Sequence, residues 1–171
     1  HTFPVPESHK VFESIHSVGK MFERLPNTYK NKGEEALRDH ILVTVDTLVN
    51  GSATGETFNK RGKTDILVRG NGCNEFVGEC KFWRGKEVFL QTLTQLLSYL
   101  SWRDTKTAVI LFVRNTDFSD ILRKVKVYIS EHPQYVRSVG EMEETCLNYE
   151  FHIIGDTARV VEVAVMLYHL S

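Results

Sequence analysis

Apolar residues recur along the chain with two kinds of spacing, and these spacings predict the elements of the fold. Spacing by three and four residues, typical of amphipathic helices, occurs in four segments: residues 11–25, 34–49, 86–102 and 117–133. Alternating or continuous apolar runs, typical of strands, occur in six segments: residues 54–60, 64–70, 74–83, 107–114, 148–156 and 159–170. The last two strands predict a hairpin that turns at Gly155 and Asp156.

The order of these elements predicts an α/β fold, in which helices pack on the faces of a mixed central sheet. Residues 107–114 are almost continuously apolar, which is typical of a central strand covered on both faces. The chain has 171 residues and no obvious internal linker, so we expect a single domain over residues 1–171. The start lacks both Met and a signal-peptide pattern, which suggests one part of a longer protein.

Composition narrows the class of protein further. Apolar residues make up 42% and charged residues 25% of the chain, as in ordinary soluble domains. No apolar run reaches the roughly 18 residues that a membrane span requires. The cysteines are odd in number and show no CxxC spacing: Cys73, Cys80 and Cys146. They predict neither a disulfide framework nor a structural zinc site, and they favour a reducing, cytoplasmic location.

Charge is informative only locally. The net charge is −1, so overall basicity gives no indication of nucleic acid. Residues 60–86, however, contain seven basic and only three acidic residues. Such a patch is typical of a phosphate-contacting surface and equally of a solvated face. The candidate nucleic-acid contacts in it are Lys60, Arg61, Lys63, Arg84 and Lys86.

One predicted hairpin contains charged residues within strands that are otherwise apolar. With its turn centred on Gly72, Asp65 lies opposite Glu79, and their Cβ atoms should be about 4.5–5.5 Å apart. Lys81 projects from the same face as Glu79, because alternate residues of a strand share a face. Two opposed carboxylates destabilise a sheet unless a cation lies between them.

A divalent cation is the partner that this pair favours. Mg²⁺ prefers carboxylate and carbonyl oxygens, and it lowers the pKa of a bound water and offsets charge in phosphodiester hydrolysis. Lys81 beside it can orient or deprotonate the water, or stabilise the developing negative charge. The alternative is a solvated sheet face with a surface ion pair. The apolar neighbours of these residues argue against that alternative, since charges in apolar strands usually need a partner.

These residues resemble the motif of the PD-(D/E)XK nuclease superfamily, which has the restriction-endonuclease-like fold. The motif residues are Asp65 and the segment Glu79-Cys80-Lys81. The αβββαβ core of that family is similar in order and length to residues 34–114, with an extra N-terminal helix and a C-terminal β-hairpin outside it. The resemblance implies that Asp65, Glu79 and the Cys80 carbonyl bind Mg²⁺ or Mn²⁺ and that Lys81 is catalytic.

Members of this family often add a glutamate from the first core helix, and Glu34 and Glu35 are the candidates here. The apolar face of the predicted helix is centred almost on Glu34, so we predict Glu34 as a further catalytic residue. The alternative is that both glutamates only favour the positive end of the helix dipole. Thr64 stands where the family has its name-giving proline, a position that varies among its members.

A further pair resembles a Gln-x-x-x-Tyr element that follows the catalytic lysine in some recombination- and CRISPR-linked branches. Gln95 and Tyr99 lie one helical turn apart, so they can contact a phosphate or a base together. Because Gln95 points away from the apolar stripe of its helix, simple exposure to solvent is equally compatible with the pattern.

The sequence therefore predicts a divalent-metal-dependent endonuclease that acts on nucleic acid, with DNA favoured over RNA. By analogy of fold, such a domain belongs to prokaryotic defence or DNA processing. The alternative is a catalytically inactive nucleic-acid-binding or regulatory module on the same fold. A homodimer and an additional domain of the same chain both stay open as partners, and no membrane association is expected.

Overall fold

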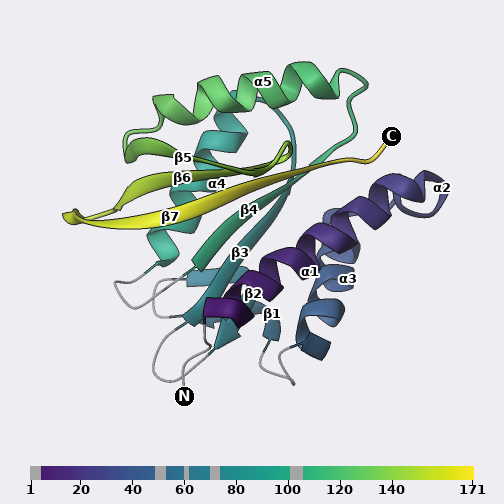
Figure 1. Cartoon of the computed structure of the whole chain (residues 1–171), viewed down its shortest axis with the longest axis horizontal. Coiled ribbons are helices and arrows are strands. Elements are labelled where there is room, and N and C mark those ends of the chain that lie inside the picture. Colours follow the sequence, from purple (N-terminus) through teal and green to yellow (C-terminus); the bar gives the residue numbers. More distant parts are fainter. Residues whose placement is uncertain (1–4, 49–52, 60–61, 70–73, 101–105) are drawn as a thin grey trace.

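The computed structural model describes residues 5–48, 53–59, 62–69, 74–100 and 106–171 (Figure 1). The helices are α1 (Val5–Arg24), the short α2 (Pro26–Tyr29), α3 (Glu34–Leu48), α4 (Lys86–Tyr99) and α5 (Phe118–Tyr128), followed by the 3-10 turn η1 (Ile129–Glu131). The strands are β1 (Ala53–Asn59), β2 (Gly62–Arg69), β3 (Asn74–Phe82), β4 (Lys106–Val113), β5 (Tyr135–Glu143), β6 (Cys146–Ile153) and β7 (Asp156–His169). Each predicted helix and strand segment overlaps one of these elements, and the predicted helix over residues 117–133 comprises α5 and η1. The predicted ends at residues 49, 60, 70 and 101–102 lie outside the described residues.

The strands that the structure describes form one mixed sheet of seven strands, in the order β1-β2-β3-β4-β7-β6-β5. β4 is central and pairs in parallel with both β3 and β7. The remaining neighbours are antiparallel. The predicted α/β class with a mixed sheet flanked by helices is confirmed.

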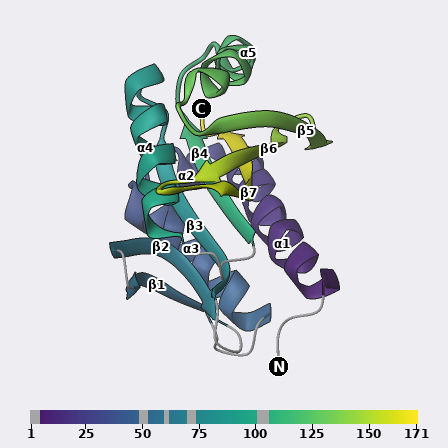
Figure 2. The same cartoon turned by 90° about the vertical axis from the view of Figure 1, so that its left-hand side faces the viewer.

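Helices cover the sheet on both faces. One apolar core joins α1 and α3 to alternate strand residues such as Ile66 and Val68, and a second core joins α4 and α5 to the intervening residues such as Leu67. Figure 2 shows α4 and α1 on opposite sides of the strands. Because β4 is buried along nearly its whole length, it needs apolar residues on both faces, which explains its unbroken apolar run.

The register between β2 and β3 is the one predicted from the hairpin over three pairs, and it shifts by one residue nearer the turn, where Arg69 lies opposite Asn74. Ile66 lies opposite Gly78, Leu67 opposite Val77, and Val68 opposite Phe76. The predicted turn around Gly72 lies outside the described residues. Continued by one residue, this register places Asp65 opposite Glu79.

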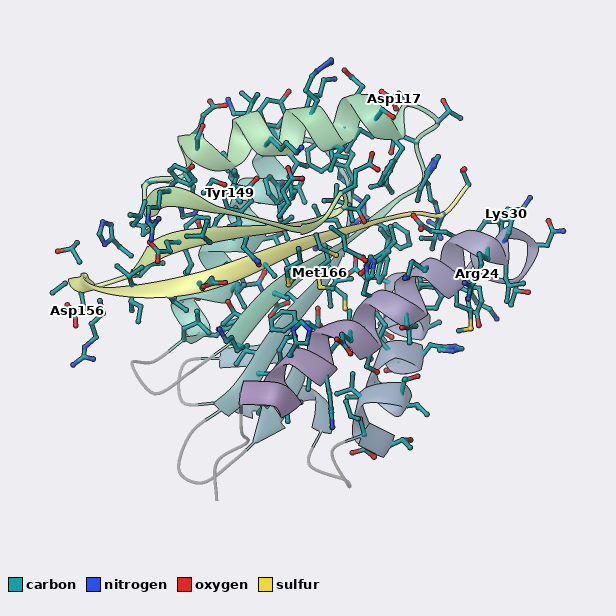
Figure 3. The ribbon with its side chains drawn as sticks, in the orientation of Figure 1. Arg24, Lys30, Asp117, Tyr149, Asp156 and Met166 are labelled. Carbon is teal, nitrogen blue, oxygen red and sulfur yellow. The ribbon has the colours of Figure 1, made fainter. Side chains whose placement is uncertain are left out.

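The C-terminal part is larger than the predicted β-hairpin. β6 and β7 form that hairpin, and Gly155 adopts a φ of 89° at its turn, a backbone conformation that glycine adopts readily. Figure 3 shows Asp156 at the tip of this hairpin. β5 adds a third antiparallel strand at the sheet edge, so the prediction of a hairpin alone was wrong in extent. Within the described residues, no helix is long and apolar enough to cross a membrane.

His132 is a buried titratable group that ties η1 to α4. The Gln134 N–H donates to His132 Nδ1 at 3.1 Å, and Thr94 Oγ1 lies 2.8 Å from His132 Nε2. Because Nδ1 accepts a hydrogen bond, the ring fits this site only as the neutral imidazole with its proton on Nε2. Burial accordingly lowers the pKa of His132.

We expect this histidine to make the fold sensitive to acid. Since the folded-state pKa lies below the unfolded value of about 6.5, the unfolded chain binds the proton more readily, and stability falls as the pH drops below about 6.5. The His132→Asn variant should remove up to one proton of this dependence, about 1.4 kcal/mol per pH unit at most. Urea unfolding at a series of pH values measures how steeply the free energy of unfolding changes with pH in the wild type and in His132→Asn. Equal pH dependence in the two proteins would contradict the prediction.

Candidate metal-dependent active site

The candidate site lies where β2 and β3 separate. Among the described residues, the backbone pairing of these strands ends at Ile66 and Gly78. Beyond that point β3 continues to Phe82 beside β4, and the Trp83 N–H donates to the Phe112 carbonyl at 2.8 Å. The N–H groups of Cys80 and Phe82 therefore point to the opposite side, where β2 no longer accepts their hydrogen bonds.

Two carboxylates accept the hydrogen bonds that β2 does not accept from this part of β3. The Cys80 N–H donates to Asp65 Oδ2 at 2.9 Å, and the Phe82 N–H donates to Glu34 Oε2 at 3.0 Å. Because buried backbone groups must be satisfied, these bonds anchor an acidic side chain from β2 and another from α3 at the same strand. The predicted residues Asp65 and Glu34 are thereby brought together at β3.

Glu79 completes the acidic group from β3 itself. Its side chain shares a strand face with Val77, because alternate residues lie on one face, and that face packs against α4. Glu79 is only 6% exposed, whereas the Asp65 side chain is 25% exposed. Lys81, which follows on the same face, is half-buried. The predicted Asp65–Glu79–Lys81 arrangement thus has one deeply buried carboxylate beside a more accessible one.

The pKa of the Cys80 thiol reflects the charges that surround it. Burial raises the pKa of Cys80 well above its ordinary value, the carboxylates of Asp65, Glu79 and Glu34 raise it further, and Arg38 lowers it. Three carboxylates and one guanidinium therefore lie around the same thiol. The Cys80 carbonyl faces the side of its own N–H, toward the gap that β2 leaves.

This donor set fits a hard divalent cation. Carboxylate oxygens of Asp65 and Glu79 and the backbone carbonyl of Cys80 are the ligand types that Mg²⁺ and Mn²⁺ prefer, and the excess of negative charge favours a cation there. The Cys80 thiol is not part of this donor set, because the Cys80 side chain packs into the core with α1 and α3, on the face of β3 opposite to that of Glu79. The acidic group is thus compatible with the predicted metal.

Arg38 is a residue of this site that the sequence analysis missed. It is 8% exposed, its Nη1 lies 3.9 Å from Asp65 Oδ1, and its Nε and Nη2 donate to Asp39 Oδ1 at 3.1 and 2.8 Å. A signal was present in the sequence: Arg38 lies one helical turn after Glu34 and next to the buried Leu37 on α3. A charge on the buried side of a helix usually has a nearby partner.

The choice between the two first-turn glutamates of α3 follows from the same geometry. Glu34 reaches the Phe82 N–H, and Arg84 Nη1 lies 4.0 Å from Glu34 Oε2. Glu35 is exposed to solvent. Glu34 is therefore the glutamate that faces β3, as the apolar direction of the helix predicted.

The predicted nucleic-acid contacts have different surroundings. Lys60 and Arg61 lie outside the described residues, and Lys63 lies on β2. Arg84 has a 58% exposed side chain beside Glu34. Lys86 lies at the start of α4, where its Nζ is 2.6 Å from Glu131 Oε1. Gln95 Nε2 donates to the Tyr99 hydroxyl at 2.6 Å, so the predicted pair on α4 is in contact.

A second arginine, Arg114, extends the basic rim on the Glu34 side. Its guanidinium carbon lies 4.0 Å from the centre of the Phe82 ring, and that of Arg84 lies 5.9 Å from the same centre. Arg114 also donates to the backbone carbonyls of Lys30 and Lys32. These bonds fix the connection between α2 and α3, whose lysines are exposed, next to the site.

Comparison of the chain with protein-family models, with curated proteins and with solved structures gives no match. Assignment of a function therefore rests on the residues and geometry of the site itself.

Proposed function

We propose that the chain is a divalent-metal-dependent endonuclease of the PD-(D/E)XK type, which hydrolyses phosphodiester bonds in nucleic acid. The observation that carries this proposal is the acidic group at the separation of β2 and β3. There, Asp65 accepts a hydrogen bond from the Cys80 N–H, and Glu34 accepts one from the Phe82 N–H. Both N–H groups lie on the edge of β3 that faces β2, beside the buried Glu79. An acidic group held by backbone N–H groups beside a half-buried lysine is more organised than a solvated face requires.

The arrangement of elements supports the same family. α3, β1, β2, β3, α4 and β4 follow in the αβββαβ order of the restriction-endonuclease-like core. Asp65 lies within β2, Glu79 within β3 and Glu34 at the start of α3. α1 and the strands β5, β6 and β7 lie outside this core.

In this proposal each residue has a distinct role. Asp65, Glu79 and the Cys80 carbonyl hold Mg²⁺ or Mn²⁺, which when bound supplies Lewis-acid stabilisation of negative charge and a more acidic water. Glu34 positions the end of β3 through the Phe82 N–H. Lys81 orients or deprotonates the attacking water, or stabilises the negative charge that develops on the phosphate. Arg84 and Arg114 present exposed positive charge to the polynucleotide backbone.

Arg38 is the observation that favours the alternative, an inactive module on the same fold. Its guanidinium lies beside Asp65 and offsets part of the charge that a metal would otherwise balance. An inactive module would keep the Arg38–Asp65 contact as a structural ion pair and would bind nucleic acid or protein without cleaving it.

Metal-dependent cleavage separates the two proposals. The metal-free chain is incubated with plasmid DNA, single-stranded DNA and structured RNA in Mg²⁺, in Mn²⁺ and in EDTA. We expect cleavage only with a metal, preferentially of DNA, and we expect Glu79→Gln to abolish it. In parallel, Mn²⁺ at about 100 times its Kd should stabilise the wild type by about 2.7 kcal/mol and should stabilise Glu79→Gln less. A chain that neither cleaves nor responds to Mn²⁺ would establish the inactive module.

A further inference from the structure

A second cluster of chemically reactive side chains lies away from the candidate active site. His16 projects from α1, Glu143 is the last residue of β5, and Cys146 is the first residue of β6. One potential ligand atom from each of the three lies within 4.8 Å of the other two. The Cys146 Sγ is 3.2 Å from His16 Nδ1, and His16 Nε2 contacts the Glu143 carboxylate.

The surroundings hold these groups in place. The Tyr168 hydroxyl of β7 lies 2.9 Å from His16 Nδ1, and Tyr168 is fully buried. Cys146 is 2% exposed and lies opposite Met166 in the β6–β7 ladder. Met166 lies on β7 beside α1 (Figure 3). Residues of α1 therefore meet residues of the C-terminal strands β5, β6 and β7, which are far from α1 in the sequence.

A pocket opens onto this cluster. Its volume is about 220 Å³, and besides the three side chains it is lined by the polar residues His9 and Glu13 and by the apolar residues Phe12, Met142 and Met166. Glu13 lies one helical turn before His16 on α1, so both point to the same side of the helix. The pocket has room for water or for a further oxygen ligand next to the cluster.

A cysteine nucleophile activated by His16 is the first function that the cluster suggests, but the chemistry opposes it. A nucleophilic cysteine requires a thiolate, whereas burial, and to a lesser degree the Glu143 carboxylate, raise the pKa of Cys146 to about 11. A bound metal ion, by contrast, stabilises the thiolate directly.

We propose that His16, Glu143 and Cys146 bind a Zn²⁺ ion, with the fourth position open to the pocket. Thiolate, imidazole and carboxylate together are the ligands of zinc, whereas Mg²⁺ and Ca²⁺ prefer oxygen ligands alone. The ion would connect α1 to the turn between β5 and β6, and so attach the sheet edge formed by β5 and β6 to this helix. The site shares no residue with the candidate active site and is independent of its function.

Cobalt substitution tests the site with a signal that does not depend on nuclease activity. Metal-free protein is titrated with Co²⁺ and then with Zn²⁺, and a thiolate-to-cobalt charge-transfer band reports coordination by a cysteine. We expect one equivalent of Co²⁺ to produce the band and Zn²⁺ to abolish it. Glu79→Gln is one control, because it removes a ligand of the other candidate metal site, and Cys80→Ser is a second, because it removes the thiol of the other described free cysteine. Both variants should keep the band.

Variants of the cluster decide the outcome. Cys146→Ser should lose the band, and Glu143→Gln should weaken Zn²⁺ affinity at least about tenfold, as the loss of even an outer metal partner typically does. Glu143 has a 53% exposed side chain, so its substitution leaves the core intact, and Glu141→Gln on the same strand is the matched control. Absence of the band in the wild type, or its persistence in Cys146→Ser, would overturn the proposal.

Discussion

The Lys81→Met variant should lose metal-dependent cleavage by at least about 10²-fold, within the range of 10²–10⁴ that positioned acid–base groups contribute. Lys81 follows the buried Glu79 on the same face of β3 and is half-buried. Methionine retains most of the aliphatic length of lysine and removes the charge and the proton. The loss should therefore appear in kcat, while nucleic-acid binding and the melting temperature change little.

A second substitution at the same position separates the roles that stay open for Lys81. The Lys81→Arg variant keeps the positive charge, but its guanidinium cannot act as a base at any working pH. If Lys81 deprotonates the water, Lys81→Arg should be as inactive as Lys81→Met. If Lys81 stabilises the developing charge, Lys81→Arg should retain part of the activity.

The matched control for these variants is Lys124→Met. Lys124 lies on α5, where its Nζ is 3.0 Å from Asp120 Oδ2 in an exposed pair, and such pairs contribute little to stability. Its substitution should leave cleavage unchanged. Cleavage by Lys81→Met at a rate close to that of the wild type, with the same metal dependence, would refute the assignment of Lys81.

The register of the candidate site was predictable because it follows from local rules. A strand has a side-chain period of two, so the alternation of apolar residues in β2 and β3 favours the register that pairs Ile66 with Gly78 and, one residue on, faces Asp65 toward Glu79. The apolar stripe of α3 likewise fixed Glu34, and not Glu35, as the residue that faces the sheet. Both predictions depend on residues that are close in the sequence or on a single element.

The features that were missed lack such a local signal. β5 has few buried residues and pairs with β6 through several register shifts. Its apolar residues therefore do not alternate, and the hydrophobic pattern does not predict a strand there. Arg38 is explained only by Asp65 on another element. The cluster of His16, Glu143 and Cys146 brings together residues that are distant in the sequence. Cys146 and His16 are 130 positions apart, and a search for metal-ligand spacing along the chain does not detect such a pair.

Gly19→Ala should destabilise the protein, although alanine is favoured over glycine inside a helix by about 0.5–1 kcal/mol. Gly19 lies within α1 where the helix approaches β7, and a Cβ at this position would overlap the ring of Tyr168. Tyr168 is fully buried and its hydroxyl lies 2.9 Å from His16 Nδ1, so the ring has little room to move. Overpacking of this kind typically costs about 1–3 kcal/mol.

We therefore expect a net loss of about 1–2 kcal/mol and a decrease in melting temperature of roughly 2–8 °C for a chain of this size. Thermal and urea unfolding measure both quantities. Ser17→Ala on the same helix is the control, because Ser17 is exposed to solvent, and it should change stability by less than about 0.5 kcal/mol.

A double variant tests whether the Tyr168 ring is the cause. Leucine is smaller than tyrosine, so Gly19→Ala should cost less in a Tyr168→Leu background than in the wild type, with a coupling free energy of roughly 0.5–3 kcal/mol. Equal costs in both backgrounds would mean that the close approach of α1 to β7 is not limited by this ring. A coupling of the expected sign would establish that glycine at position 19 sets the distance between the helix that carries His16 and the strand that carries Tyr168.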